Sequence, residues 1–172
     1  MLVRPLTEEY PAYYVPYVGL VPDGNLEEIL QQQQTDTCAL FSKLSGKEAD
    51  YRYAPEKWMT KEVLGHITDT ERIMSYRLLR VLRGDKTPLA GFDEGEYMKN
   101  APFHHWSVSD LLDNYTAVRQ STLVLLHGVD AKDWMRKGIA NNMDVSARAI
   151  AYIIAGHERH HAQIVRERYL AM

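Results

Sequence analysis

Residues 151–169 read A-Y-I-I-A-G-H-E-R-H-H-A-Q-I-V-R-E-R-Y, and this stretch decides the fold. A helix turns by about 100° per residue, so the apolar side chains of the segment gather into one stripe. His157 and His161 fall at the centre of that stripe, one turn apart, whereas His160 falls at its edge. We therefore expect a helix over 145–170 that packs its apolar stripe, with both histidines, against other helices.

The spacing of His157 and His161 suits a metal ion. Residues four apart on a helix have Cβ atoms about 5–6 Å apart, and a metal held about 2.0–2.1 Å from each ring nitrogen bridges that gap. Two buried neutral imidazoles without partners would leave polar atoms unsatisfied, and a metal would satisfy both. The alternative is a pair of core histidines hydrogen-bonded to carbonyls, tyrosines or water, and the spacing leaves both interpretations open.

A third ligand is expected from a facing helix, and residues 60–83 predict such a helix. Thr60 is its expected N-cap, and arginines crowd its last turns, as suits the helix dipole. His66 falls on the flank of the apolar stripe rather than at its centre. From its position on the helix alone, His66 is therefore equally compatible with a metal ligand and with a surface residue.

Gly65-His66 and Gly156-His157 are the only glycine–histidine pairs in the chain. A glycine inside a helix costs about 1 kcal/mol relative to alanine, so a packing or functional reason is expected for each. We hypothesise that these glycines let two helices approach closely where the histidines converge.

Two further segments carry helix signals. Residues 25–44 begin at Asn25, a good cap, and are followed by Gly46 as the expected stop. Residues 107–127 begin at Ser107 with the pattern of a capping box. Together with the first two, these segments give four long helices.

These signals predict an all-α fold. Asp144 or Ser146 is the expected cap of the last helix, a short helix is expected over 130–136, and no strand-like alternation is present. Four helices of about 20 residues span about 30 Å each, the size of a four-helix bundle. Residues 85–106 form a long crossover between the second and third helices, and 1–172 is expected to be a single domain.

Two segments outside the predicted helices are rich in aromatic side chains. The N-terminal arm, residues 1–22, holds Tyr10, Tyr13, Tyr14 and Tyr17. The crossover 85–106 holds Phe92, Tyr97, Phe103 and Trp106. The favoured interpretation is that both segments close over the bundle or a partner, and the alternative is that their rings wall a pocket.

Composition excludes several classes of protein. Cys38 is the single cysteine, which rules out an internal disulfide and a cysteine-built zinc finger. A net charge of −3 gives no excess of positive charge to attract nucleic acid or an anionic membrane. No apolar run approaches the length of about 20 residues that a membrane helix needs. With no targeting signal, the cytoplasm is the expected compartment. Three histidines fit no ligand spacing and are expected on the surface: His104, His105 and His127.

The residues from His157 to His161 also match H-E-x-x-H, the zinc-protease signature in which Glu158 would be the general base. No glycine follows His161 for the extended form of the motif, and no strand precedes it to build a cleft, so a protease is disfavoured. Glu158 is then expected either to act on metal-bound water or to be a solvated helix residue. Asp69, one turn after His66, is expected either to orient a ligand ring or to be solvated.

Two segments carry a resemblance to a known family. Residues 58–77 read W-M-T-K-E-V-L-G-H-I-T-D-T-E-R-I-M-S-Y-R, and they combine with the quoted 151–169. The chain resembles the DinB-like (YfiT-like) superfamily of metal-dependent enzymes over nearly its whole length. The opening Arg4-Pro5 and the loop 84–94 are similar to this family as well.

The resemblance implies a four-helix bundle, commonly a homodimer, in which one histidine of the second helix and two of the fourth hold a divalent metal. Carried onto this sequence, those ligands are His66, His157 and His161, with nickel or zinc the usual metal and water completing its shell. Related members include S-transferases that use bacillithiol or mycothiol and a mycothiol-dependent maleylpyruvate isomerase, and many others are assigned as hydrolases.

The expected function is that of a divalent-metal-dependent enzyme acting on a small molecule, with thiol S-transfer slightly favoured over hydrolysis. No residue is assigned as catalytic, and nucleic acid and membrane are not expected partners. The competing hypothesis is a non-catalytic dimeric bundle that the metal only stabilises, and an open position beside a substrate-sized pocket would favour the enzyme. Because Cys38 lies outside the histidine cluster, a reacting thiol is expected to arrive as a low-molecular-weight cofactor.

Overall fold

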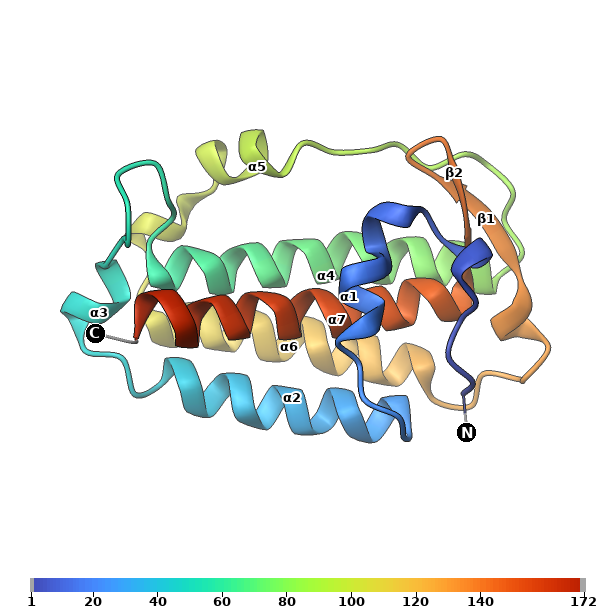
Figure 1. The fold of residues 1–172 in the computed structure, drawn as a ribbon, viewed down its shortest axis with the longest axis horizontal. Helices are drawn as coiled ribbons and strands as arrows, with labels where there is room; N and C mark the ends of the chain where they lie inside the picture. Colours follow the sequence, from blue (N-terminus) through green and yellow to red (C-terminus); the bar gives the residue numbers. More distant parts are fainter. Residues whose placement is uncertain (1, 171–172) are drawn as a thin grey trace.

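Four long helices run alongside one another in the computed structural model, which describes residues 2–170 (Figure 1). They are α2 (Leu26–Phe41), α4 (Thr60–Leu82), α6 (Val108–Leu126) and α7 (Ala147–Ile164). Helix α4 packs against α6 and α7, and α2 packs against the same two helices. The predicted all-α four-helix bundle, with its long crossover between the second and third long helices, is therefore confirmed. No helix within residues 2–170 has both the length and the apolar character that crossing a membrane requires.

Shorter elements occupy the connections. The short α-helices are α1 (Val15–Gly19), α3 (Gly46–Asp50) and α5 (Glu94–Asn100). The 3₁₀ turns are Thr7–Glu9, Ala12–Tyr14, Pro102–His105 and Asp133–Met135, and α7 continues as a π-helical turn, Val165–Tyr169. The short helix expected over 130–136 is thus a single 3₁₀ turn. Helix α1 lies across α7, and α5 lies above α4 (Figure 1).

The sequence predicts no strand, yet a β-hairpin precedes α7. Strand β1 (Lys137–Ala140) pairs antiparallel with β2 (Met143–Ser146), and the partners run from Lys137 opposite Ser146 to Ala140 opposite Met143. Asn141 and Asn142 form the turn with φ of 51° and 61°, the left-handed values that two-residue hairpin turns require. The expectation was wrong because each strand is only four residues long, too short for alternation to stand out.

Three helices begin at their predicted caps, which are Asn25 for α2, Ser107 for α6 and Ser146 for α7. Asn25 Oδ1 accepts a hydrogen bond from the Glu27 N–H at 3.0 Å, and Ser146 Oγ accepts one from the Ala149 N–H at 3.1 Å. Each bond satisfies one of the free N–H groups of a first turn. Of the two caps predicted for α7, Asp144 and Ser146, it is therefore Ser146 that caps the helix.

Two predicted helix ends were wrong. Thr60 lies inside α4, and the carboxylate of Glu62 accepts the Met59 N–H at 2.7 Å, so this end is closed from within the helix. Gly46 does not stop α2, which has already ended, and instead it opens α3 behind the cap Ser45. A glycine after a helix is compatible with either role, and the serine before it decides.

The core is apolar towards both ends of the bundle and polar in its middle. Leu64 packs in one apolar cluster and Leu78 in the other, with Glu71 between them on α4. Glu71 meets the fully buried Arg119 of α6, and Arg119 also meets Glu158 of α7. Arg119 also donates to a backbone carbonyl of α2, so this buried polar layer ties all four long helices together at mid-height.

Candidate metal centre

Three histidine rings meet between α4 and α7. The Nε2 atom of His66 lies 3.1 Å from Nε2 of His157 and 3.2 Å from Nε2 of His161. One ring nitrogen from each residue lies within 4.8 Å of the other two. His66 and His157 are buried and His161 is partly buried. The structure thus brings together the three histidines that the sequence and the resemblance had selected.

The residues present fit a divalent cation. Ligands about 2.0–2.1 Å from a tetrahedral ion stand about 3.3 Å apart, close to the Nε2 separations of this cluster. Within residues 2–170 these Nε2 atoms have no hydrogen-bond partners except one another. That observation counts against the alternative of core histidines hydrogen-bonded to carbonyls or tyrosines. His66 Nε2 faces two other ring nitrogens, and one nitrogen cannot make a good hydrogen bond to both of them.

Burial keeps the imidazoles neutral. It lowers the pKa of His66 to about 4 and, with the neighbouring His66 and His160, lowers that of His161 to about 3. Burial, reinforced by the surrounding imidazoles, also holds the pKa of His157 well below its usual range. A neutral ring keeps a nitrogen lone pair free, which is the form that a metal ligand needs.

Side chains from other segments surround the cluster. The Tyr17 ring of α1 meets the rings of His157 at 5.6 Å and His160 at 5.1 Å between centroids, and the Trp58 ring lies 4.7 Å from that of His66. The half-exposed carboxylate of Glu94, the first residue of α5, places Oε2 3.9 Å from His66 Nε2. His160 therefore contacts the wall of the site and stands outside the three-nitrogen cluster.

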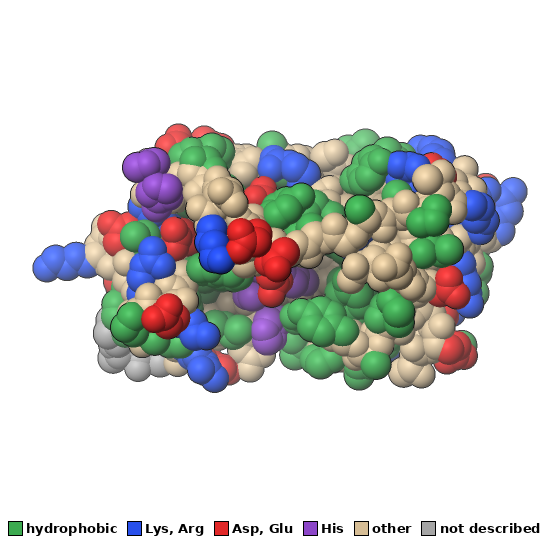
Figure 2. All heavy atoms as spheres, turned by 90° about the horizontal axis from the view of Figure 1, so that it is seen from above, with side chains coloured by type: hydrophobic (Ala, Val, Ile, Leu, Met, Phe, Trp, Pro, Cys, Tyr) green, Lys and Arg blue, Asp and Glu red, His purple; other side chains and the backbone are tan. Residues whose placement is uncertain are grey.

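A pocket of about 890 Å³ opens beside the histidines. His157 is part of its lining, together with aromatic rings of the N-terminal arm, of the crossover and of the turn before α4: Tyr13, Tyr14, Tyr17, Phe92 and Trp58. Figure 2 shows histidine side chains in a hollow on this face, with acidic side chains on one side and apolar ones on the other. Both interpretations of the aromatic segments hold in part: three tyrosines of the arm and Phe92 wall this pocket, whereas Tyr10 and Phe103 pack in the core.

Both expectations for Glu158 were wrong. Its side chain is 1% exposed and faces α2 and α6 in the bundle interior rather than the histidine cluster. Its carboxylate accepts hydrogen bonds from Thr37 at 2.6 Å, from Tyr115 at 2.5 Å and from Arg119 at 2.5 Å. Glu158 is therefore neither a base at the metal nor a solvated residue, and of the protease signature only the two histidines, His157 and His161, lie at the site.

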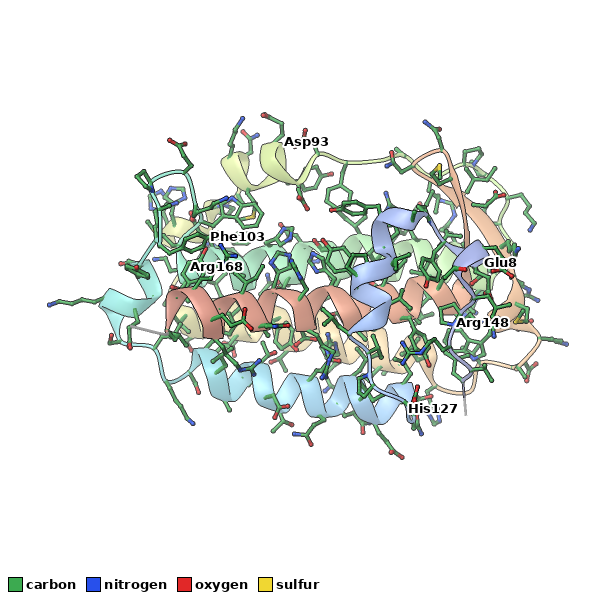
Figure 3. The ribbon with its side chains drawn as sticks, in the orientation of Figure 1. Glu8, Asp93, Phe103, His127, Arg148 and Arg168 are labelled. Atoms are coloured by element: carbon green, nitrogen blue, oxygen red, sulfur yellow. The ribbon has the colours of Figure 1, made fainter. Side chains whose placement is uncertain are left out.

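Gly65 and Gly156 make room for the covering segments rather than for a close approach of α4 and α7. A Cβ atom on Gly156 would stand 2.0 Å from the carbonyl oxygen of Tyr17, and one on Gly65 would stand 2.3 Å from the Phe103 ring. Phe103 reaches down to α4 from beneath α5 (Figure 3). The hypothesis about the glycines was right that they permit close contact beside the histidines, and wrong about which segments make it.

The remaining candidates lie away from the cluster. Asp69 pairs with Arg72 at 3.2 Å, and no contact within residues 2–170 joins its carboxylate to His66, so it does not orient that ring. His127 lies exposed at the far end of the bundle (Figure 3), and His104 and His105 are exposed as predicted. The Cys38 thiol lies on α2, with Thr116 Oγ1 at 3.8 Å.

Sequence reasoning missed Glu94, Trp58 and Arg77 as parts of the site. Trp58 and Arg77 bound the motif around His66, but nothing in the spacing shows that they face a pocket. Glu94 reaches His66 only because the crossover folds back over α4, a long-range event without a local signal. The clusters of aromatic residues were the one available sign of these walls.

Comparisons with known proteins agree with this fold. Residues 29–165 match the sequence profile of the DinB superfamily. The structure of YfiT from Bacillus subtilis, described as a probable metal-dependent hydrolase with an unusual four-helix bundle topology, aligns with a TM-score of 0.73 and 13% identity over 96% of this chain and 93% of that chain. At that identity the likeness shows the fold alone, and no curated protein matches the chain significantly. The match over most of the sequence shows that the chain belongs to the DinB superfamily.

Proposed function

We propose that this protein is a metal-dependent enzyme in which His66, His157 and His161 hold one divalent cation, nickel or zinc. The observation that carries the proposal is the convergence of three neutral ring nitrogens at the edge of a pocket large enough for a small-molecule substrate. Three protein ligands leave positions free on the ion, which is how catalytic sites differ from closed structural ones. A fourth buried ligand, which a purely stabilising site would have, is not among the described residues of the cluster.

When bound, such a cation lowers the pKa of a thiol or a water and so supplies a nucleophile at neutral pH. The protein residues then have separate tasks. Tyr17 and Trp58 cover the rings of His157 and His66 and limit the access of bulk water to them. The Glu94 carboxylate, 3.9 Å from His66 Nε2, is the acceptor placed to receive the proton that the nucleophile loses.

We propose thiol S-transfer as the reaction. Beyond the histidines the pocket wall carries tyrosines and Arg77, which suit an acidic organic thiol of the bacillithiol type, whereas a hydrolase would need only a channel for water. The thiol sulfur would form a bond to an electrophilic carbon of the substrate while the bond from that carbon to its leaving group breaks. Cys38 does not line this pocket, so the thiol is supplied by a cosubstrate.

Hydrolysis is the second candidate, and one specific observation favours it. The position of Glu94 would suit a base acting on water as well as on a thiol, and the similar structure of YfiT is described as that of a probable hydrolase. A non-catalytic, metal-stabilised dimer receives less support, because a stabilising ion needs no open pocket of this size beside it.

The first test is the metal content of the purified protein after loading with zinc or nickel, measured by mass spectrometry. We expect one ion per chain in the native protein and in His104→Ala, whose histidine is exposed and remote, and a large loss in His157→Ala. An unaltered metal content in His157→Ala, or no metal in the native protein, would overturn the proposal.

The second test separates the two reactions in the metal-loaded protein. Conjugation of monochlorobimane, in which a thiol displaces chloride, reports S-transfer, and cleavage of p-nitrophenyl esters reports hydrolysis. We expect conjugation with carboxylate-bearing thiols and its loss in His157→Ala. Ester cleavage without conjugation would replace the transferase assignment by the hydrolase.

A further inference from the structure

Arg77 is a buried cation without a carboxylate partner. Its side chain is 4% exposed, and no carboxylate of residues 2–170 lies within ion-pair distance of it. The two other buried arginines of this region are paired, Arg119 with two buried glutamates and Arg148 with Glu9. Because burying an unpaired charge is costly, a buried arginine that faces a pocket calls for an anion from outside the chain.

The guanidinium of Arg77 is held in place by protein contacts that leave some of its N–H groups free to donate. It donates from NH2 to the Ala90 carbonyl at 2.7 Å and from NH1 to the Met74 sulfur at 3.4 Å, and it lies over the Phe92 ring at 5.6 Å. Arginine carries five N–H groups, and the Tyr14 hydroxyl is a further polar neighbour of the guanidinium, so about two remain without a protein acceptor among the described residues. A fixed orientation with free N–H groups is the arrangement that binds a planar carboxylate with little entropic cost.

Thr70 supplies a second, independent sign of a ligand. Its side-chain oxygen is buried, has no hydrogen-bond partner within residues 2–170, and belongs to the lining of the same pocket. Thr68 and Thr122, by contrast, satisfy their hydroxyls on the helix carbonyl four residues earlier, at 2.8 and 3.1 Å. A buried threonine that leaves this usual bond unmade is placed to bond a polar group that enters the pocket.

These groups lie in line along α4. From His66, Thr70 is one turn further on, and Arg77 lies about 16 Å along the axis at 1.5 Å per residue. The Arg77 side chain reaches back towards Met74, which shortens the span from the histidines to the guanidinium to about 12 Å. The carboxylate of Glu94 lies at the histidine end of the pocket, so the pocket has one acidic and one basic end.

We propose that Arg77 binds the carboxylate of an elongated organic acid, with Thr70 bonding a polar group midway along it. The ligand is a small molecule whose carboxylate lies about 10 Å from the atom that reaches the three histidines. This inference deepens the proposed function and rests on it for the reacting atom alone, since the Arg77 contact requires no metal.

The test uses octanoate and octanol, two probes of equal chain length that differ in charge. Calorimetry on the metal-free full chain compares the native protein with Arg77→Met and with Arg72→Met, a matched control whose arginine is exposed on α4 and pairs with Asp69. We expect octanoate to bind the native protein at least about tenfold more tightly than octanol. This preference should disappear in Arg77→Met and persist in Arg72→Met.

Several outcomes would overturn the assignment. Equal binding of the two probes to the native protein would do so, as would a loss of the preference in Arg72→Met. If Arg77 only holds the Ala90 segment in place, Arg77→Met should weaken both probes equally. Should Arg77→Met fail to fold, Arg77→Gln, which keeps an N–H donor for the Ala90 carbonyl and removes the charge, must lose the preference for octanoate. Metal content is measured separately, so failure of the proposed function leaves the octanoate result readable.

Discussion

The chemistry of a residue in this protein depends on what lies opposite it rather than on the motif in which it stands. Glu158 follows His157 directly, but adjacent positions on a helix point about 100° apart. His157 therefore faces α4 and the pocket, whereas Glu158 faces Gln33, Thr37 and Arg119 in the interior. A match to H-E-x-x-H says only that two histidines share a face, and the glutamate between them needs its own evidence.

The network around Arg119 leads to a stability prediction. Arg119→Met would leave Glu71 and Glu158 buried without their cation, and breaking a buried pair in this way typically costs about 3–5 kcal/mol. Urea denaturation should show this loss in the free energy of unfolding. The exposed Arg72→Met should change it by less than about 0.5 kcal/mol, and a loss below about 1 kcal/mol in Arg119→Met would show that the network is dispensable.

Glu9 should make stability depend on pH in the acid range. Burial alone raises the pKa of this carboxyl, but hydrogen bonds from Arg148, the Leu6 N–H and Ser146 outweigh it and lower the pKa from 4.5 to about 2. Because the folded-state pKa lies below the unfolded one, the stabilisation is complete above about pH 4.5 and is lost as pH falls towards 2.

The corresponding variant is Glu9→Gln, with the exposed neighbour Glu8→Gln as its control (Figure 3). Acid titration of the free energy of unfolding should lose up to about 3 kcal/mol between pH 4.5 and 2 in the native protein. Glu9→Gln should flatten this slope, and Glu8→Gln should not. An unchanged slope in Glu9→Gln would contradict the role given to the pair.

At the scale of elements, the two covering segments complete the site, and glycines admit them. Helix α1 rests on Gly156 of α7 through the backbone of Tyr17, and the turn that holds Phe103 rests on Gly65 of α4. A backbone contact cannot yield as a flexible side chain can. A side chain at position 156 should therefore displace α1 from its place on α7.

Gly156→Ala should destabilise the protein by about 1–3 kcal/mol, the usual cost of overpacking, and should expose the segment around α1 to limited proteolysis. The control is Gly19→Ala on α1 itself, where an added Cβ meets nothing within 4 Å and which should be neutral or slightly stabilising. Equal protection from proteolysis in the two variants would show that α1 does not depend on the contact with α7.

The elements differ in how far the sequence predicts them. The long helices are predicted by caps such as Asn25 and Ser146 and by apolar periodicity, both of which are local signals. The hairpin does not, because its short strands form only where Leu89 of the crossover bridges to Ala140. Helical periodicity placed His157 and His161 correctly but left the role of His66 undecided. The surroundings of His66 include Trp58, which only the tertiary fold brings into place.

At the scale of the whole molecule, the site is shared by segments that are distant in sequence. His66 of α4 meets His157 and His161 of α7 across 91 and 95 positions of chain, so the cluster exists only in the folded protein. Any cation that binds it therefore stabilises the fold by mass action.

This linkage gives the last prediction. Zinc or nickel at about 100 times its dissociation constant should stabilise the native protein by about 2.7 kcal/mol, which raises the melting temperature of a chain of this size by about 5–10 °C. A chelator should reverse the shift. His104→Ala should keep it, because that ring is exposed and stands outside the histidine cluster, whereas His66→Ala and His161→Ala should each lose most of it. An equal shift in all three variants would mean that the metal binds elsewhere, because a metal held by the cluster needs the rings of His66 and His161 and not that of His104.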